Sequence, residues 1–141
     1  MEREVKFSLV FRDMWQSAGK DVPRVDQLVK VAPAIIEMGC FARVETNGGG
    51  FEQVNLLFGE NPNRAVREWT KPFHEAGIQT HMLDRALNGL RMSPVPADVR
   101  KLFYKVKHAQ GTDITRTFCG LNDVRNIIPS IGYAHEAGMI S

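Results

Sequence analysis

The chain changes from helix to strand within the segment Glu75–Leu83, which has the sequence EAGIQTHML. A glycine just past the last helical turn can adopt the left-handed backbone conformation that ends a helix. The residues after Gly77 are mostly apolar or β-branched, as is typical of a strand. The segment therefore predicts a helix that stops at Gly77 and leads directly into a strand.

The same kind of junction recurs along the chain, and the repeat predicts the fold class. The junctions are Glu37–Gly39, Glu75–Gly77, Ala109–Gly111 and Glu136–Gly138. The predicted strands are Val5–Phe11, Phe41–Glu45, Ile78–Leu83 and Ile114–Phe118, and a fifth should begin at Met139. Strands that alternate with helices indicate an α/β fold, in which crossover helices connect parallel strands.

Helical patterns fill the segments between the predicted strands. The first, Val25–Met38, carries an apolar stripe that Pro33 interrupts, so the helix should bend there. Further helices should begin at Asn61, which can cap a helix, near Pro96 and near Asn122.

Two α/β architectures fit this alternation: a doubly wound sheet and a (β/α)₈ barrel. A doubly wound dinucleotide-binding sheet usually has a G-x-G-x-x-G loop after its first strand, but Phe11–Ser17 is charged and has no glycine. The glycine-rich segment Asn47–Phe51 instead predicts a tight loop whose backbone approaches a ligand or a neighbouring strand. These features argue against a dinucleotide-binding fold.

Composition excludes several classes of protein. The 141 residues carry a formal charge of only +2, with Lys and Arg dispersed, so no nucleic-acid partner is expected. No apolar run approaches the roughly 20 residues that cross a bilayer, and the charged start is unlike a signal peptide, so we expect no membrane insertion and a cytoplasmic location. Cys40 and Cys119 lack disulfide or metal-site spacing and should be reduced, partly buried thiols.

Polar residues follow the predicted strands, at the edge where parallel α/β folds bind ligands. Asp13 can hold a divalent cation, or can cap the next turn or pair with Arg12. Arg12 and Arg85 can clamp a carboxylate, with Gln16 and Asn88 adding hydrogen bonds, or can be solvated surface groups.

Other ionisable residues have structural explanations. Glu45 is expected to be a buried partner of an arginine or to orient a neighbouring side chain. His81, within a predicted strand, should be a hydrogen-bonded interior group, whereas His74, His108 and His135 should face solvent from helices.

The strand-end residues, taken in order, resemble the N-terminal half of the biotin-dependent carboxyltransferase barrels. That family includes the alpha subunit of oxaloacetate decarboxylase, the carboxyltransferase domain of pyruvate carboxylase and the central subunit of transcarboxylase. It lies in a superfamily with hydroxymethylglutaryl-CoA lyase and isopropylmalate synthase. The matching motifs are Arg12-Asp13-x-x-Gln16-Ser17, Val44-Glu45 with Gly48-Gly49, Leu56-x-x-Gly59-Glu60-Asn61-Pro62, Arg85-x-x-Asn88 and Asn122-Asp123-x-Arg125-Asn126.

The resemblance implies a fold and a site. Residues 1–141 would be half of a TIM (β/α)₈ barrel, with four parallel strand–helix units. Asp13 would be the first ligand of a divalent metal (Zn, Mn or Co), and Arg12, Gln16 and Arg85 would hold pyruvate or oxaloacetate, with Asn88 beside them. CO₂ would pass between the keto acid and biotin, carried on a separate domain, through an enolate that the metal and the arginines stabilise.

Some positions depart from the family, and other functions stay open. Trp15 stands where the family commonly has histidine, and Cys119-Gly120 where it has Asp-Ala. The family's other metal ligands belong to the second half of the barrel, so we expect this chain to be inactive alone and to pair with that half or with a second copy. The alternatives are an acyl-CoA lyase or condensing enzyme of the same superfamily, and a non-catalytic half-barrel scaffold.

Overall fold

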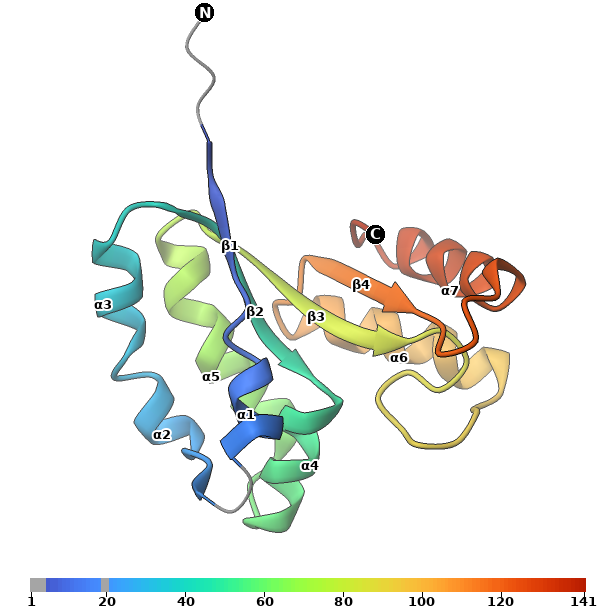
Figure 1. Cartoon of the computed structure of the whole chain (residues 1–141), viewed down its shortest axis with the longest axis horizontal. Helices are drawn as coiled ribbons and strands as arrows, with labels where there is room; N and C mark the ends of the chain where they lie inside the picture. Colours follow the sequence, from blue (N-terminus) through green and yellow to red (C-terminus); the bar gives the residue numbers. More distant parts are fainter. Residues whose placement is uncertain (1–4, 19–20) are drawn as a thin grey trace, which may run out of the picture.

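Four parallel strands form one sheet in the order β1-β2-β3-β4 (Figure 1). The computed structural model describes residues 5–18 and 21–141, and the side chains of Trp15 and Gln16 lie outside the description. The strands are β1 (Phe7–Leu9), β2 (Phe41–Gly48), β3 (Gln79–Arg85) and β4 (Ile114–Phe118). The predicted parallel α/β sheet is therefore confirmed, with strand bounds shifted by a few residues.

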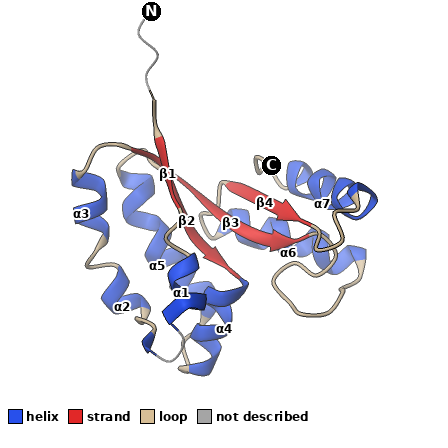
Figure 2. Cartoon of the chain, viewed as in Figure 1, coloured by secondary structure: helices blue, strands red, loops and turns tan. Residues whose placement is uncertain are grey.

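Helices alternate with the strands along the chain (Figure 2). They are α1 (Asp13–Ala18), α2 (Val25–Leu28), α3 (Ala32–Glu37), α4 (Gly49–Leu57), α5 (Pro62–Glu75), α6 (Ala97–Ala109) and α7 (Val124–Glu136). Asn61 caps α5 as predicted, because its side-chain oxygen accepts hydrogen bonds from the backbone N–H groups of Asn63 and Arg64.

All four junction glycines have the left-handed backbone that their position predicted. Their φ angles are +67° at Gly39, +72° at Gly77, +97° at Gly111 and +86° at Gly138. After Gly138 the chain starts to pair with β4, because Ile140 forms a parallel bridge with Ile114. This single bridge lies where the fifth strand was predicted to begin, but the described residues there form no strand.

Two sequence predictions need correction. The predicted bent helix over Val25–Met38 is two helices, because Pro33 occupies the first turn of α3, where its missing N–H costs no helical hydrogen bond. The predicted loop Asn47–Phe51 is wrong: its first two residues end β2, and α4 begins at Gly49. Burial of Phe51 and Val54 stabilises this helix despite its glycine-rich start.

The core lies between the sheet and the helices, in two clusters. The larger joins β2 to α2, α3, α4 and α5, and Trp69 is fully buried within it beside Phe73 and Phe11. The smaller surrounds Met82 and Tyr104 between β3, α6 and α7. No helix in the described ranges is long and apolar enough to span a membrane.

Several apolar residues of α6 do not face this core, although Phe103 packs against the smaller cluster. Val99, Leu102 and Val106 are exposed, whereas Arg100, Tyr104 and Lys107 are buried. Helical spacing therefore located the helix correctly, but the buried side of α6 is largely polar.

The other face of the sheet is concave. The Ser8 hydroxyl in β1 hydrogen-bonds to Nε2 of His81 in β3 at 2.9 Å, which spans β2. Arg116 in β4 reaches Glu45 in β2 at 2.7 Å, which spans β3. Such contacts between next-nearest strands on one face are favoured by the curvature of a sheet, as in half of a barrel.

Replacing Trp69 with alanine should lower the unfolding free energy by about 3–5 kcal/mol, because it removes the largest fully buried side chain among those that the structure describes. Urea unfolding followed by far-UV circular dichroism measures the change. Leu57→Ala is the control: its side chain is 82% exposed, so it should change stability by no more than about 0.5 kcal/mol. Equal effects of the two changes would contradict this packing.

Candidate functional site

The carboxyl ends of the strands converge on a small pocket of about 90 Å³. Arg12 follows β1, Gly49 follows β2, Arg85 ends β3 and Phe118 ends β4, and all four line the pocket together with Leu83. Arg12 is 4% exposed and Arg85 is half-buried. The structure thus brings together the two arginines that the sequence suggested as a carboxylate clamp.

Two consecutive glycines make room for these arginines. A β-carbon on Gly48 would lie 2.9 Å from Cδ of Arg12, and one on Gly49 would lie 2.9 Å from Nη1 of Arg85. Both separations are shorter than any normal carbon contact, so larger residues here would push away the stem of Arg12 and the guanidinium group of Arg85. The expected close approach of the backbone to a neighbouring strand is also present, because a β-carbon on Gly48 would lie 3.1 Å from the Leu83 carbonyl in β3.

A buried carboxylate links three strands beneath the pocket. Glu45 is fully buried; its Oε2 lies 3.6 Å from Nη2 of Arg12, and its Oε1 accepts a hydrogen bond from Nη2 of Arg116 at 2.7 Å. The predicted pairing of Glu45 with an arginine is confirmed for Arg12. The contact of Arg116 with Glu45 was not predicted. The one sequence feature that could have indicated it is that Arg116 is a charged residue within a strand of apolar and β-branched residues.

Asp13 lies at the same rim but is largely solvated. It is the first residue of α1, its side chain is 60% exposed, and its Oδ1 lies 3.5 Å from Nη1 of Arg12. Among the residues that the structure describes, no three His, Cys, Asp or Glu side chains form a metal-binding group. Asp13 by itself is therefore a single potential ligand, and the side chain of Gln16 lies outside the description.

Asn88 lies in a second pocket that shares Arg85 with the first. This pocket is about 430 Å³, and Phe118, Cys119 and Asn126 also line it. Asn126 donates a hydrogen bond to Sγ of Cys119 at 3.4 Å, which lowers the pKa of that thiol. Both cysteines are free and partly buried, as predicted. Arg85 and Asn88 are thus close together, and Arg85 and Phe118 line both the smaller and the larger pocket.

His81 is a neutral group on the concave face. It is buried, and desolvation lowers its pKa to about 4, helped by the positive charges of Arg116, Arg43 and Arg12. Its Nε2 has Ser8 as a partner, while its buried Nδ1 has none among the described residues. The predicted interior histidine is therefore confirmed, but only one of its nitrogens is hydrogen-bonded.

Asp84, which precedes Arg85, points to the opposite side of the sheet. Its carboxylate accepts hydrogen bonds from Tyr104 at 2.7 Å, from Thr117 at 3.0 Å and from Thr115. Burial raises the pKa of this carboxyl group. Asp84 therefore belongs to the core under α6 and is not part of the rim pocket.

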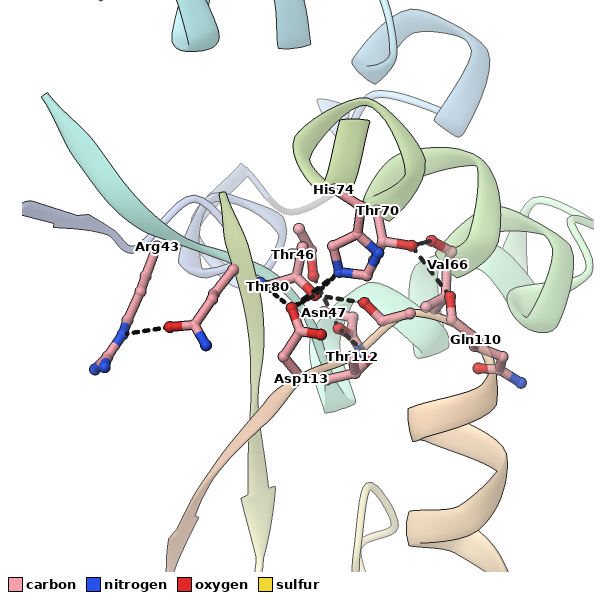
Figure 3. A network of polar contacts seen from close by, with 12 residues as sticks. Arg43, Thr46, Asn47, Val66, Thr70, His74, Thr80, Gln110, Thr112 and Asp113 are labelled. Atoms are coloured by element: carbon pink, nitrogen blue, oxygen red, sulfur yellow. Dashed lines mark hydrogen bonds and ion pairs between the residues drawn. The ribbon is translucent and has the colours of Figure 1, made fainter. Parts of the chain in front are cut away.

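A polar network also lies away from the pocket, near the amino ends of β3 and β4 (Figure 3). Asp113 accepts hydrogen bonds from His74 at 2.9 Å and from the backbone N–H of Thr80 at 2.8 Å, and Thr70 donates to the Gln110 carbonyl at 3.1 Å. The network ties α5 to the start of β4, so it stabilises the arrangement of strand–helix units.

The pocket at the amino ends of the strands has few ionisable side chains. It is about 470 Å³ and its lining includes Lys6 and Cys40, with mostly glycine, alanine and aliphatic residues around them. The carboxyl-end pockets therefore form the better candidate site, because two arginines line one small volume there.

Comparisons with known proteins support the resemblance seen in the sequence. No protein-family model matches the chain. One of the pyruvate carboxylase subunits of Methanocaldococcus jannaschii is 30% identical over 128 residues, which are 91% of this chain and 22% of that protein. Pyruvate carboxylase of Schizosaccharomyces pombe is 32% identical over 139 residues, which are 97% of this chain and 12% of that protein. The chain thus spans less than a quarter of the length of these relatives.

Solved structures confirm the fold. The carboxyl transferase domain from Rhizobium etli pyruvate carboxylase superposes with a TM-score of 0.84 at 24% identity, over 96% of this chain and 23% of that one. The same domain with pyruvate and biocytin gives 0.83 at 20% identity, over 98% of this chain and 23% of that one. The four parallel strands and their helices are therefore a half barrel of the TIM type, as predicted.

The neutral state of His81 predicts how stability depends on pH. The unfolded chain should bind a proton at this imidazole near pH 6.5 and the folded chain only near pH 4, so the unfolding free energy should fall as pH drops from 6.5 to 4. The contribution is at most about 3 kcal/mol. His81→Asn should flatten this part of the curve, measured by urea unfolding at several pH values. His135→Asn, on an exposed part of α7, should leave the slope as it is; a slope unchanged by both variants would refute the assignment.

Gly49→Ala should displace the guanidinium of Arg85, because the added carbon would lie 2.9 Å from Nη1 and 3.1 Å from the Leu90 carbonyl. Binding of a small carboxylate such as oxalate, followed by NMR titration, should weaken by about tenfold. Gly132→Ala is the control, since a β-carbon there meets nothing within 4 Å. Unchanged oxalate binding by Gly49→Ala would show that Arg85 does not depend on this glycine.

Proposed function

We propose that this chain, a homologue of the carboxyltransferase domain of pyruvate carboxylase, forms the first half of a biotin-dependent carboxyltransferase barrel and holds an α-keto acid between Arg12 and Arg85. The observation that carries the proposal is that Arg12 and Arg85 line one small pocket, where the stem of Arg12 packs against Gly48 and the guanidinium of Arg85 against Gly49. The resemblance, the relatives and the pocket chemistry point to the same residues.

The pocket suits a small anion. At about 90 Å³ it is well below the roughly 300–1,000 Å³ of sites for larger ligands. Guanidinium groups bind carboxylates through two parallel hydrogen bonds, which fixes the orientation of the anion as well as its charge. Arg12 is buried and Arg85 half-buried, so their attraction for an anion is screened less than at an open surface. Pyruvate and oxaloacetate are the proposed ligands.

In the proposed reaction, CO₂ moves between a biotin nitrogen and the methyl carbon of pyruvate. When pyruvate is carboxylated, the nitrogen–carbon bond of carboxybiotin breaks, the methyl group gives up a proton that ends on the released biotin nitrogen, and a new carbon–carbon bond forms to the CO₂. Negative charge develops on the pyruvate oxygen as the proton leaves. Arg12 and Arg85 would stabilise this charge, because they are already oriented before it appears.

Metal and biotin enter the proposal from the resemblance and the relatives. Asp13 would be one ligand of a divalent cation, Zn, Mn or Co, which when bound supplies positive charge next to the keto oxygen. Since no three His, Cys, Asp or Glu side chains of the described residues form a metal-binding group, the remaining ligands would come from the rest of a complete barrel, and we expect this chain alone to be inactive. The R. etli domain was solved with pyruvate and biocytin, which supports a biotin carrier as the partner.

The charges of the concave face favour the second half of a barrel over a second copy as the other partner. Arg12, Arg43, Arg85 and Arg116 lie on this face or its rim with one buried carboxylate, Glu45. A second copy would bring the same excess of positive charge, which opposes self-association. A cytoplasmic location stays a prediction.

Arg85→Lys should weaken pyruvate binding by about tenfold, because Nη1 of Arg85 donates to the Leu90 and Arg91 carbonyls and a single ammonium group cannot keep these contacts and also form the paired hydrogen bonds of a guanidinium. NMR titration of the chain with pyruvate measures the dissociation constant. Arg67→Lys, on the exposed side of α5, is the matched control and should bind pyruvate as the unchanged chain does.

A parallel titration with acetyl-CoA separates the proposal from its superfamily alternative. Tighter binding of acetyl-CoA than of pyruvate would favour an acyl-CoA lyase or condensing enzyme. Binding of neither ligand would leave a half-barrel scaffold. A third assay measures oxaloacetate decarboxylation with free biotin and added Zn²⁺, Mn²⁺ or Co²⁺. Activity that is unchanged in Asp13→Ala would contradict the proposed site.

A further inference from the structure

Arg116 makes a long contact across the concave face that the proposed function does not use. Its side chain starts in β4, passes over β3 and donates a hydrogen bond from Nη2 to Oε1 of Glu45 in β2 at 2.7 Å. The side chain of Arg116 is 48% exposed, whereas that of Glu45 is fully buried. Arg116 therefore covers a carboxylate that solvent does not reach.

The second oxygen of Glu45 faces Arg12. Oε2 lies 3.6 Å from Nη2 of Arg12, which is an ion-pair distance, and it accepts no hydrogen bond from the described residues. Arg12 is also 3.5 Å from Asp13. The guanidinium of Arg12 is thus held electrostatically between two carboxylates, and Glu45 itself is hydrogen-bonded by Arg116.

We propose that Arg116 is a positioning residue, which keeps Glu45 from drawing Arg12 out of the rim pocket and so preserves the geometry that binds the keto acid. This inference rests on the proposed function, because it concerns how the arginine that binds the substrate is held in place. Arg116 itself does not line the pocket between Arg12 and Arg85.

A buried charge without a partner is costly. A carboxylate removed from water needs hydrogen-bond donors or a close opposite charge, and leaving it unpaired is strongly destabilising. Among the described residues, Arg116 is the side chain that donates a hydrogen bond to Glu45. Without it, the nearest cation is Arg12 at 3.6 Å. Arg12 would then move toward Glu45 to reach hydrogen-bond distance.

Arg43 provides a matched comparison. It lies on β2 two residues before Glu45, and its Nε donates to the Gln79 side chain at 3.3 Å. Arg43 thus places the same charge on the same face, but it hydrogen-bonds to a neutral group. Removing it changes the net charge as much as removing Arg116 does, without taking a donor from Glu45.

The test follows the Arg12 side chain directly. The Nε–H signal of Arg12, assigned in ¹⁵N NMR spectra by its loss in Arg12→Lys, should shift in Arg116→Ala and stay close to its original position in Arg116→Lys and in Arg43→Ala. Pyruvate titrations of the same variants should show about fivefold weaker binding for Arg116→Ala and less than about twofold change for the other two. Arg116→Met keeps the apolar stem but has no donor, so a shift of the Arg12 signal in this variant too would separate the positioning role from loss of packing.

Each outcome decides the proposal. An Arg12 signal that does not move in Arg116→Ala, or that moves equally in Arg43→Ala, would overturn it. If Arg116→Ala does not fold, Arg116→Met, which keeps the apolar stem, takes its place. If the unchanged chain binds no pyruvate, the proposed function fails, while the Arg12 signal still shows whether Arg116 positions that side chain.

Discussion

Parallel pairing of the four strands is the constraint on which the site depends. Each strand runs in the same direction because a helix, ended by a left-handed glycine, returns the chain to the starting edge of the sheet. The carboxyl ends therefore meet at one rim, where Arg12 and Arg85 face one pocket although 73 positions separate them in the sequence. The pairing thus creates the site, and the two glycines at the end of β2 give the arginines the space they need.

Electrostatics, more than apolar packing, organises the concave face. The interior of a TIM barrel is usually filled by bulky aliphatic side chains. Here a buried carboxylate, Glu45, lies between Arg12 and Arg116, and the same cations help to keep His81 neutral. Buried ion pairs of this kind contribute little net stability, but a misplaced partner is costly. Their effect is therefore to restrict where each guanidinium can lie.

Sequence patterns predicted the features that depend on neighbouring residues. The junction glycines, the Asn61 cap and all four strands were correct because backbone conformation and capping act over a few positions. The predicted loop at Gly49 was wrong, since burial of Phe51 outweighs the low helix propensity of glycine. The exposure of Val99, Leu102 and Val106 in α6 could not be predicted either, because helical spacing identifies the apolar residues of a helix but not the element that covers them.

The sequence by itself determined the order of strands and helices, the α/β class, the resemblance to carboxyltransferase barrels and the residues at the strand ends, because each depends on local composition and spacing. Tertiary structure alone decided that Arg12 and Arg85 share a pocket, that Asp84 turns toward the helices, and that Arg116 hydrogen-bonds to Glu45. The physical reason is that these contacts join residues from different strands and helices. Their distances follow from sheet register and curvature, which no single segment of the chain specifies.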